Sequence, residues 1–329
     1  MATFTVLTAP ELNELANEFS LGTVRAFRAI AAGTINSNFA IETDVGRFFL
    51  RVNEGKSEDD VAWEARLVGA LASRRVTTPK PMAAQDGRLY AAVPGGSSPT
   101  KWVSAFPWRA GSHLAAGDVT PQHARTFGQA LAALHLAALE LPKGWRRASI
   151  YDHAHLVDRF ARIEAAGDPE LADAVTILRE ELEAAAAAAP IRRAATHGII
   201  HGDLFRDNVL WDGDRISAIL DFEQASGGSL AYDLAVCIND WCWSDRDRAA
   251  RMDLATSLVA GYHAVRPLEA ADREALPAEL SASSARFTIT RITDVYLAKV
   301  PNPEKDFRAF LARCGAWRTQ SVQLLTSLS

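Results

Sequence analysis

The residues best able to do chemistry lie in two neighbouring stretches, His201–Leu210 (HGDLFRDNVL) and Ile219–Glu223 (ILDFE). Asp203 and Asn208 are five positions apart, and Asp221 follows after a short turn. Phosphoryl transfer needs a carboxylate to receive the proton of the acceptor hydroxyl, and oxygen ligands to hold Mg²⁺ against the phosphates. Each residue taken singly could merely cap a turn. Together, they predict Asp203 as the proton acceptor, with Asn208 and Asp221 as metal ligands.

Short elements must bring these three side chains together. The apolar run 198–200 leads the chain to the first motif, and segments 209–211 and 216–220 are short and apolar, as expected for strands. Asp212-Gly213-Asp214 between them is typical of a turn. The resulting hairpin is expected to place the three side chains near one another. The catalytic loop of protein kinases likewise has a base Asp with a metal-binding Asn five positions later, and a further Asp from the next hairpin also binds metal.

The motifs resemble the aminoglycoside phosphotransferase and choline kinase superfamily of small-molecule kinases. Two later segments, YDLA at 232–235 and NDWC at 239–242, make the chain similar to the homoserine kinases of that superfamily. The resemblance implies an α+β, bilobal, protein-kinase-like fold. Residues 1–106 would form a small antiparallel-sheet lobe that binds nucleotide, and residues 107–329 a larger, mostly helical lobe with the catalytic and acceptor sites.

The same resemblance implies a mechanism. The γ-phosphate of ATP, bound between the lobes with Mg²⁺, would pass directly to the acceptor hydroxyl. Asp233 would anchor the catalytic loop, and His201 would order that loop rather than act as the base. Glu223 could assist with a second metal. His135, on the apolar face of a helix expected at 120–139, is expected to be structural.

The nucleotide phosphates are expected to meet the polar loop before the hairpin 39–52. Its candidate contacts are Thr34, Asn36 and Ser37. Neither GxGxxG nor the Walker pattern is present, so this prediction depends on the resemblance. The adenine is expected to contact the backbone around 104–106, with Ser104 and Phe106 as the marked positions.

One charged pair is predicted from helical spacing. Glu64 shares a stripe with apolar residues of the helix expected at 58–72, and a carboxylate on a buried face needs a partner. Arg51 stands where kinase-like proteins usually carry a phosphate-binding lysine. We therefore predict a Glu64–Arg51 pair, as in the lysine–glutamate pair of kinases, although arginine and lysine are not interchangeable.

Candidate contacts to the acceptor lie around and after the catalytic loop. The planar fork of arginine matches a carboxylate, so Arg286 or Arg291 could hold one, and Arg206 is a further candidate. Asp240 or Asp294 could take an ammonium group. Surface charges and intrahelical pairs remain alternatives for each of these residues.

The amino-acid composition narrows the class of protein to which this chain can belong. The 35 Lys and Arg against 40 Asp and Glu give a net charge of −5, without the basic surplus typical of nucleic-acid binding. The three cysteines lack CxxC spacing, and neither a secretory signal nor a run long enough for a membrane span is evident. We expect a cytoplasmic enzyme that acts on a small molecule. Its oligomeric state is left open.

Three functions stay open at this point. The first is an ATP-dependent L-homoserine kinase, on the way to threonine. The second is a kinase for another hydroxylated amine, such as choline, an aminoglycoside or a hydroxylated amino acid, because fold does not fix the substrate. The third is a non-catalytic nucleotide-binding pseudokinase, which only the substituted lysine supports.

The remaining elements are expected by pattern. Strands are expected at 24–30, 89–93 and 101–106. Helices are expected from Thr8, at 152–165, at 169–189 ending at Pro190, and at 236–243, where the polar pair 239–240 interrupts an otherwise apolar helix. The glycine-rich segment 226–229 is expected to be a loop.

Overall fold

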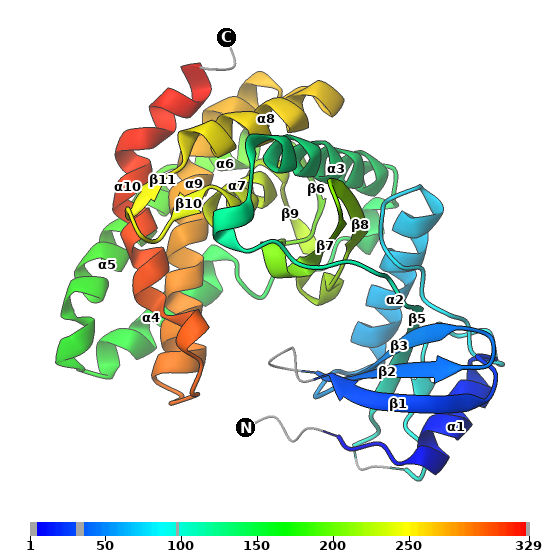
Figure 1. Cartoon of the computed structure of the whole chain (residues 1–329). Helices are drawn as coiled ribbons and strands as arrows, with labels where there is room; N and C mark the ends of the chain where they lie inside the picture. Colours follow the sequence, from blue (N-terminus) through cyan, green and yellow to red (C-terminus); the bar gives the residue numbers. More distant parts are fainter. Residues whose placement is uncertain (1–4, 31–35, 97–98, 327–329) are drawn as a thin grey trace. The chain divides into compact units, whose positions relative to one another are not determined.

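The computed structural model describes residues 5–30, 36–96 and 99–326 (Figure 1). The chain forms two compact units. The smaller unit comprises Met1–Gly111, Leu210–Asp212 and Ser217–Glu223, and the larger unit comprises Ser112–Val209, Gly213–Ile216 and Gln224–Ser329. Each unit is described by itself below.

A five-stranded antiparallel sheet forms the centre of the smaller unit, with the strand order β1-β2-β3-β5-β4. The strands are β1 (Val24–Ile30), β2 (Ser37–Thr43), β3 (Arg47–Asn53), β4 (Ala91–Ala92) and β5 (Trp102–Pro107). Side chains alternate between the two faces of a strand. Phe39, Ile41, Leu50 and Val52 therefore point to one face, where they join the apolar core.

Helix α1 (Ala9–Glu18) covers that apolar face, since its buried side chains belong to the same core. Thr8 caps the helix by accepting the Glu11 amide, and Glu11 returns a bond to the Thr8 backbone, which forms a capping box. Helix α2 (Glu58–Ser73) begins at the Ser57 cap and carries three acids in its first turn, as the helix dipole favours. It meets the sheet from the face that carries Arg51.

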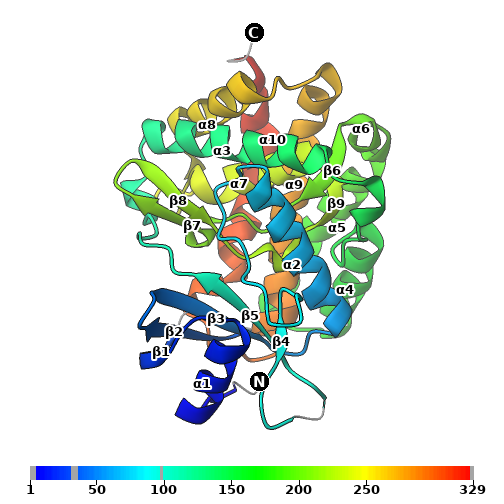
Figure 2. The same ribbon diagram turned by 90° about the vertical axis from the view of Figure 1, so that its right-hand side faces the viewer.

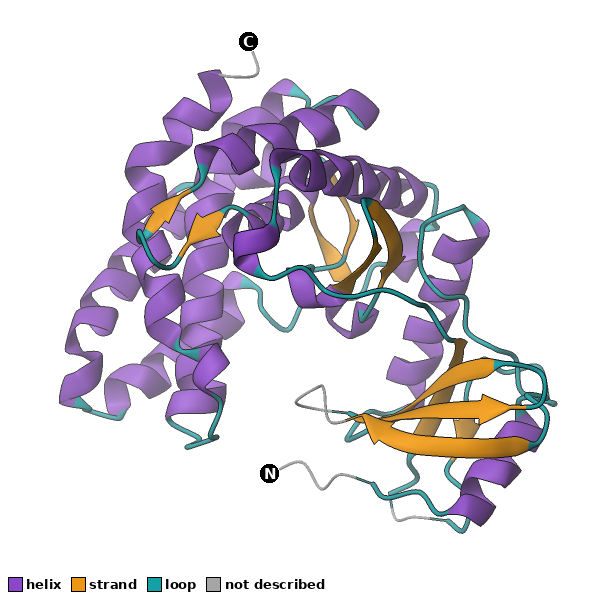
Figure 3. Ribbon diagram, viewed as in Figure 1, coloured by secondary structure: helices purple, strands orange, loops and turns teal. Residues whose placement is uncertain are grey.

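The larger unit consists mainly of helices (Figure 3). They are α3 (Pro121–Leu139), α4 (His153–Ala165), α5 (Ala172–Ala187), α6 (Ala189–Ala194), α7 (Leu230–Trp241), α8 (Met252–Val265), α9 (Ala270–Arg291) and α10 (Phe307–Thr326). Helices α3 and α8 approach closely at two glycines. A Cβ on Gly128 would collide with the Leu258 carbonyl, and one on Gly261 with the Arg125 carbonyl. Both positions therefore require glycine.

Short strand pairs position the catalytic loop (Figure 2). Strand β6 (His197–Ile200) pairs with β9 (Ser226–Ser229), and β7 (Val209–Asp212) pairs with β8 (Arg215–Ile219). The loop between β6 and β7 ends in a 3₁₀ turn, Arg206–Asn208. A third pair, β10 (Trp243–Ser244) with β11 (Ala249–Ala250), follows α7.

Four local expectations were wrong. Segment 226–229 is a strand, because its glycines allow the backbone to approach β6: a Cβ on Gly228 would come within 2.5 Å of Ile200. The strand expected at 89–93 is confined to Ala91–Ala92, with one further backbone bond from the Val93 amide to the Lys101 carbonyl. Helix α7 begins at Leu230, well before the expected residue 236, and its two polar residues, Asn239 and Asp240, are buried with partners. Pro190 lies in the first turn of α6, where its missing N–H costs nothing.

In the part of the chain that the structure describes, no helix is both long and apolar enough to span a membrane.

Candidate active site

The catalytic loop is held by one buried carboxylate. Asp233, near the start of α7, accepts the backbone amides of His201 and Gly202, each at 2.8 Å. Gly202 has a φ of +78°, which glycine adopts without strain. Burial alone would raise the pKa of Asp233, but the hydrogen bond and charge of His135, together with the Gly202 amide, outweigh burial and lower it. Asp233 therefore makes the hydrogen bonds to the catalytic loop that its expected anchoring role requires.

Behind Asp233 lies a buried chain of polar side chains. His135 Nε2 lies 3.0 Å from Asp233 Oδ2, and His135 Nδ1 lies 2.7 Å from the Tyr262 hydroxyl. Arg266 donates to that hydroxyl and to Asp272. His135 is fully buried, so its expected structural role is confirmed. This series of hydrogen-bonded side chains connects α3, α7, α8 and the start of α9, and its polar groups are satisfied, as a buried network requires.

Asp203 and Asn208 close the loop on itself. The Asn208 side-chain amide donates to the Asp203 carbonyl at 2.8 Å. The Asp203 carboxylate is about one third exposed and lies 3.5 Å from Arg286 Nη1. The Arg286 guanidinium lies against the rings of Tyr151 (4.0 Å) and Phe287 (3.8 Å). The predicted base is thus reachable by solvent and oriented by a nearly buried cation.

A second ion pair connects the catalytic loop to α7. Arg206 donates to Asp240 through its backbone amide, Nε and Nη2 at 2.8–3.3 Å. Two residues predicted to contact the acceptor therefore bind each other. Between Arg206 and Asn208, burial raises the pKa of Asp207, and the charges of Asp240 and Asp203 raise it further.

The other predicted acceptor contacts are distributed along α9 and the turn after it. Arg291 donates to the Asp306 carbonyl at 3.0 Å. Asp294 pairs with Arg159 at 2.6 Å and is about half exposed. Asn239 is fully buried and bonds to Leu280, Ser283, Ser284 and Trp317, so its polar atoms serve packing.

In the smaller unit the predicted pair is present. Arg51 Nη2 lies 2.7 Å from Glu64 Oε2, and both side chains are about one tenth exposed. Arg51 Nη1 lies 3.5 Å from Asp221 Oδ1. Burial lowers the pKa of Arg51, but Glu64 and Asp221 outweigh burial and raise it, so the guanidinium stays charged. Asp221 has a φ of +61°, an uncommon backbone conformation that aspartate tolerates better than most residues.

The polar loop of the smaller unit is organised around Glu54. Ser37 donates to the Glu54 carboxylate at 2.7 Å, and the Glu54 amide donates to Asn36. The Asn36 side chain also donates to Glu223 at 2.9 Å. Thr34 lies outside the described residues. The phosphate-binding role of this loop stays a prediction.

The segment expected to contact adenine is β5. The Ser104 hydroxyl lies 3.1 Å from the Asn53 side-chain amide, and the Ala105 carbonyl accepts the Met82 amide at 2.8 Å. Phe106 pairs with Phe49 across the sheet. These contacts fix the strand, and its part in nucleotide binding stays a prediction.

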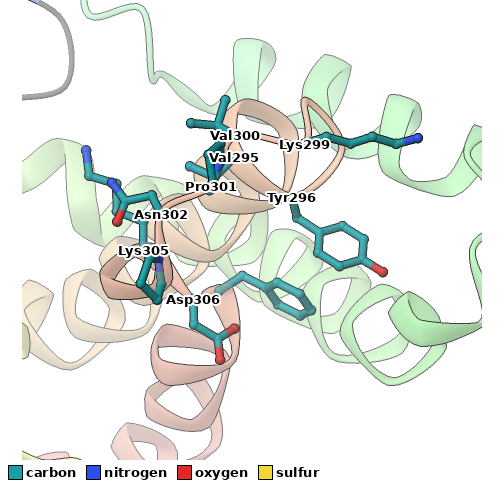
Figure 4. A pocket seen from close by; sticks show the side chains of 10 residues that line it. Val295, Tyr296, Lys299, Val300, Pro301, Asn302, Lys305 and Asp306 are labelled. Atoms are coloured by element: carbon teal, nitrogen blue, oxygen red, sulfur yellow. The ribbon is translucent and has the colours of Figure 1, made fainter.

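A cavity of about 460 Å³ lies in the larger unit, where the chain passes from α9 to α10 (Figure 4). Its lining includes Val295, Tyr296, Val300 and Lys305. A small ligand would fit, but neither the catalytic loop nor Arg286 lines the cavity, so we assign it no role. Within the described residues no three His, Cys, Asp or Glu side chains form a metal cluster.

Comparison with known proteins decides the family. The sequence profile of the phosphotransferase enzyme family matches residues 26–268. The chain belongs to the phosphotransferase enzyme family. It is an ATP-dependent small-molecule kinase of this family, as the catalytic loop predicted.

Curated relatives resemble the chain over most of its length. A homoserine kinase of Methylobacterium radiotolerans is 35% identical, covering 89% of this chain and 88% of the relative. A homoserine kinase of Xanthobacter autotrophicus is 33% identical with the same coverage.

Solved structures share the fold. Amicoumacin kinase in complex with AMP-PNP aligns with a TM-score of 0.69 at 15% identity, over 95% of this chain and 92% of its own. Choline kinase of Cryptosporidium parvum aligns with a TM-score of 0.64 at 14% identity, over 93% and 92%. The predicted α+β, kinase-like fold is confirmed.

Sequence reasoning missed Arg313, which is 4% exposed on α10. A signal was available. Arg313 adjoins an apolar stripe at helical spacing, formed by Phe310, Cys314 and Trp317. A charged residue beside such a stripe indicates a buried partner, as the carboxylate of Glu64 did on its own helix.

Proposed function

We propose that this enzyme transfers the γ-phosphate of ATP to the side-chain hydroxyl of L-homoserine, with Mg²⁺. The observation that supports L-homoserine as the acceptor is the similarity to homoserine kinases along nearly the full length of both chains. The contacts of Asp203 in the larger unit support the chemistry.

Asp203 receives the proton of the acceptor hydroxyl. Arg286, fixed between two aromatic rings, holds one carboxylate oxygen, so the other oxygen is available to the acceptor. Asn208 braces the loop through the Asp203 carbonyl. Direct attack on the phosphate follows, because positioning and charge stabilisation supply most of the catalysis in phosphoryl transfer.

Mg²⁺, when bound, neutralises the charge of the phosphates and orients them. Asn208 and Asp221 would hold it. Their oxygen atoms are of the kind that Mg²⁺ prefers, and the ion is commonly held by one or two protein groups plus substrate phosphates rather than by a large protein cluster. Glu223, which accepts from Asn36, is a candidate for a second ion.

Arg51 is proposed to bind nucleotide phosphate. Its pairing with Glu64 fixes a charged guanidinium on β3, and the planar fork suits phosphate oxygens. In kinase-like proteins the residue at this position contacts the α- and β-phosphates, and we propose the same contact for Arg51.

The test is ADP release with Mg-ATP and a panel of L-homoserine, choline, hydroxylysine and an aminoglycoside. We expect turnover with L-homoserine alone, and a loss of kcat of at least about 100-fold in Asp203→Asn, because a general base typically contributes 10²–10⁴-fold. Asp173→Asn, an exposed carboxylate of α5, is the matched control and keeps wild-type turnover.

Each outcome has a definite meaning. Turnover with another acceptor keeps the mechanism and refutes the homoserine proposal. ATP binding without turnover of any acceptor favours the pseudokinase alternative. Full activity of Asp203→Asn would refute the proton-acceptor role.

A further inference from the structure

Arg313 of α10 is a buried cation that the mechanism above does not use. Its Nη2 donates to Asp245 Oδ1 at 3.3 Å, while its Nε and Nη1 are buried and make no hydrogen bond among the described residues. Burying an unpaired donor is costly, and more so when the group is charged. A bound anion would complete these donors and remove that cost.

Arg313 has a second cation beside it. The guanidinium carbons of Arg291 and Arg313 lie 4.4 Å and 4.0 Å from the centre of the same ring, Phe310. Burial lowers the pKa of both arginines, that of Arg313 to about 10, despite the nearby charge of Asp240. Arg291 itself contributes to lowering the pKa of Arg313. An additional anion at this place would stabilise both cations.

The arginine pair is built onto the catalytic loop. Phe310 stacks on Phe205 with centroids 5.7 Å apart and planes 7° apart, and Phe205 lies two residues after Asp203. The charge of Asp203 also acts on Arg291. A ligand held by this pair would therefore lie in the neighbourhood of the base.

The other arginines near the loop each face a carboxylate of the protein. Arg206 uses its backbone amide, Nε and Nη2 on Asp240. Arg286 Nη1 faces the proposed base Asp203, although its Nε is buried and makes no hydrogen bond among the described residues. Arg291 and Arg313 are left with donors for an anion. The planar fork of an arginine matches the two oxygens of a carboxylate, and both arginines pack against the Phe310 ring.

We propose that Arg313, together with Arg291, forms the subsite that binds the carboxylate of the acceptor, and that this subsite makes the enzyme select amino-acid alcohols over amino alcohols. The inference rests on the proposed function for the choice of homoserine as acceptor. The phosphates of ATP are the other possible source of an anion, and the test separates the two.

The test compares acceptors that differ by the carboxylate alone. L-Homoserine and 3-aminopropan-1-ol share the hydroxyl and the ammonium group at the same spacing. For Arg313→Met, which retains an apolar stem against Phe310, we expect the ratio of kcat/KM for homoserine over 3-aminopropan-1-ol to fall by about 10- to 100-fold, mostly through KM. Arg291→Met should act in the same direction. Arg179→Met, an exposed arginine of α5, is the matched control and leaves the ratio unchanged.

A binding measurement removes the dependence on turnover. Calorimetry with L-2-aminobutyrate, which keeps the carboxylate and ammonium but lacks the hydroxyl, should show binding to wild type and binding at least about tenfold weaker to Arg313→Met. The circular-dichroism spectrum of each variant shows whether it is folded, and Arg291→Met supplies the result if Arg313→Met is unfolded.

The outcomes are separable. An unchanged acceptor ratio, a rise in KM for Mg-ATP alone, or no binding of L-2-aminobutyrate to wild type would each overturn the inference. If wild type binds L-2-aminobutyrate through Arg313 but does not phosphorylate homoserine, the subsite stands and the proposed function fails.

Discussion

Asp233→Asn is the substitution that most directly tests how the catalytic loop is held. The aspartate accepts two backbone amides at 2.8 Å and faces His135 Nε2 at 3.0 Å. Asparagine is nearly the same size, but it has one acceptor oxygen and an NH₂ group in place of the second. The change therefore removes hydrogen bonds and leaves the packing volume almost unaltered.

The magnitude follows from those bonds. A hydrogen bond to a charged group contributes about 1.5–3 kcal/mol. Asparagine can keep one amide bond, so the loss of the rest, with an amide NH₂ facing a backbone N–H, is expected to lower the free energy of unfolding by about 3–5 kcal/mol. For a unit of this size that corresponds to a fall in Tm of roughly 10 °C.

Activity should fall by more than stability explains. A small displacement of the loop backbone moves Asp203, and misplacing a catalytic group by about 1 Å can cost about 100-fold in rate. The assays are thermal unfolding and ADP release at a temperature where the variant is folded. Asp253→Asn, a half-exposed aspartate of α8, is the control and should stay within about 0.5 kcal/mol of wild type.

The dependence on pH gives an independent check. The pKa of Asp233 is lowered in the folded protein, so its contribution to stability is present above the pKa of the unfolded chain and is lost as pH falls through the folded pKa. The stability gap between wild type and Asp233→Asn should therefore be largest near neutral pH and shrink in acid. A variant with wild-type Tm and kcat, or a gap that widens in acid, would refute the reasoning.

Two further predictions concern the Arg51–Glu64 ion pair and the close contact between α3 and α8. Arg51→Ala and Glu64→Ala should each raise the KM for ATP by about tenfold or more, because the first removes the proposed phosphate-binding guanidinium and the second removes the carboxylate that holds it at 2.7 Å; an unchanged KM in both variants would remove the pair from nucleotide binding. Gly128→Ala and Gly261→Ala should each lower the free energy of unfolding by about 1–3 kcal/mol, measured by urea unfolding, since the added methyl meets backbone of the opposite helix. Gly315→Ala in α10, which meets nothing within 4 Å, is the control and should be neutral or stabilising, so a loss equal to that of Gly128→Ala would contradict the close-packing argument.

Several features followed from the sequence by local rules. Spacing and residue type marked Asp203, Asn208 and Asp221, because phosphoryl transfer requires those groups. The helical stripe that contained Glu64 predicted a buried cation as its partner, and Arg51 is that partner. The Thr8 cap and the turns around the hairpin were equally local, since they depend on neighbouring residues.

The structure decided the features that depend on contacts between distant segments. Glycines at 227–228 suggested a loop, yet they form a strand that pairs with β6, and a Cβ on Gly228 would meet the Ile200 side chain of β6. Asp240, a candidate contact for the acceptor, binds Arg206, a pairing that arises only once α7 packs beside the catalytic loop.

The buried network around His135 and the pair Arg291 and Arg313 also depend on contacts between distant segments, which the sequence did not predict. His135, Tyr262 and Arg266 lie on separate helices or helix turns. Arg291 of α9 and Arg313 of α10 meet at the Phe310 ring only because α9 packs against α10. The sequence by itself determined which chemistry the chain can perform, because that depends on residue types at short spacing. The tertiary structure alone decided which charges meet, because burial and long-range packing select one partner among many.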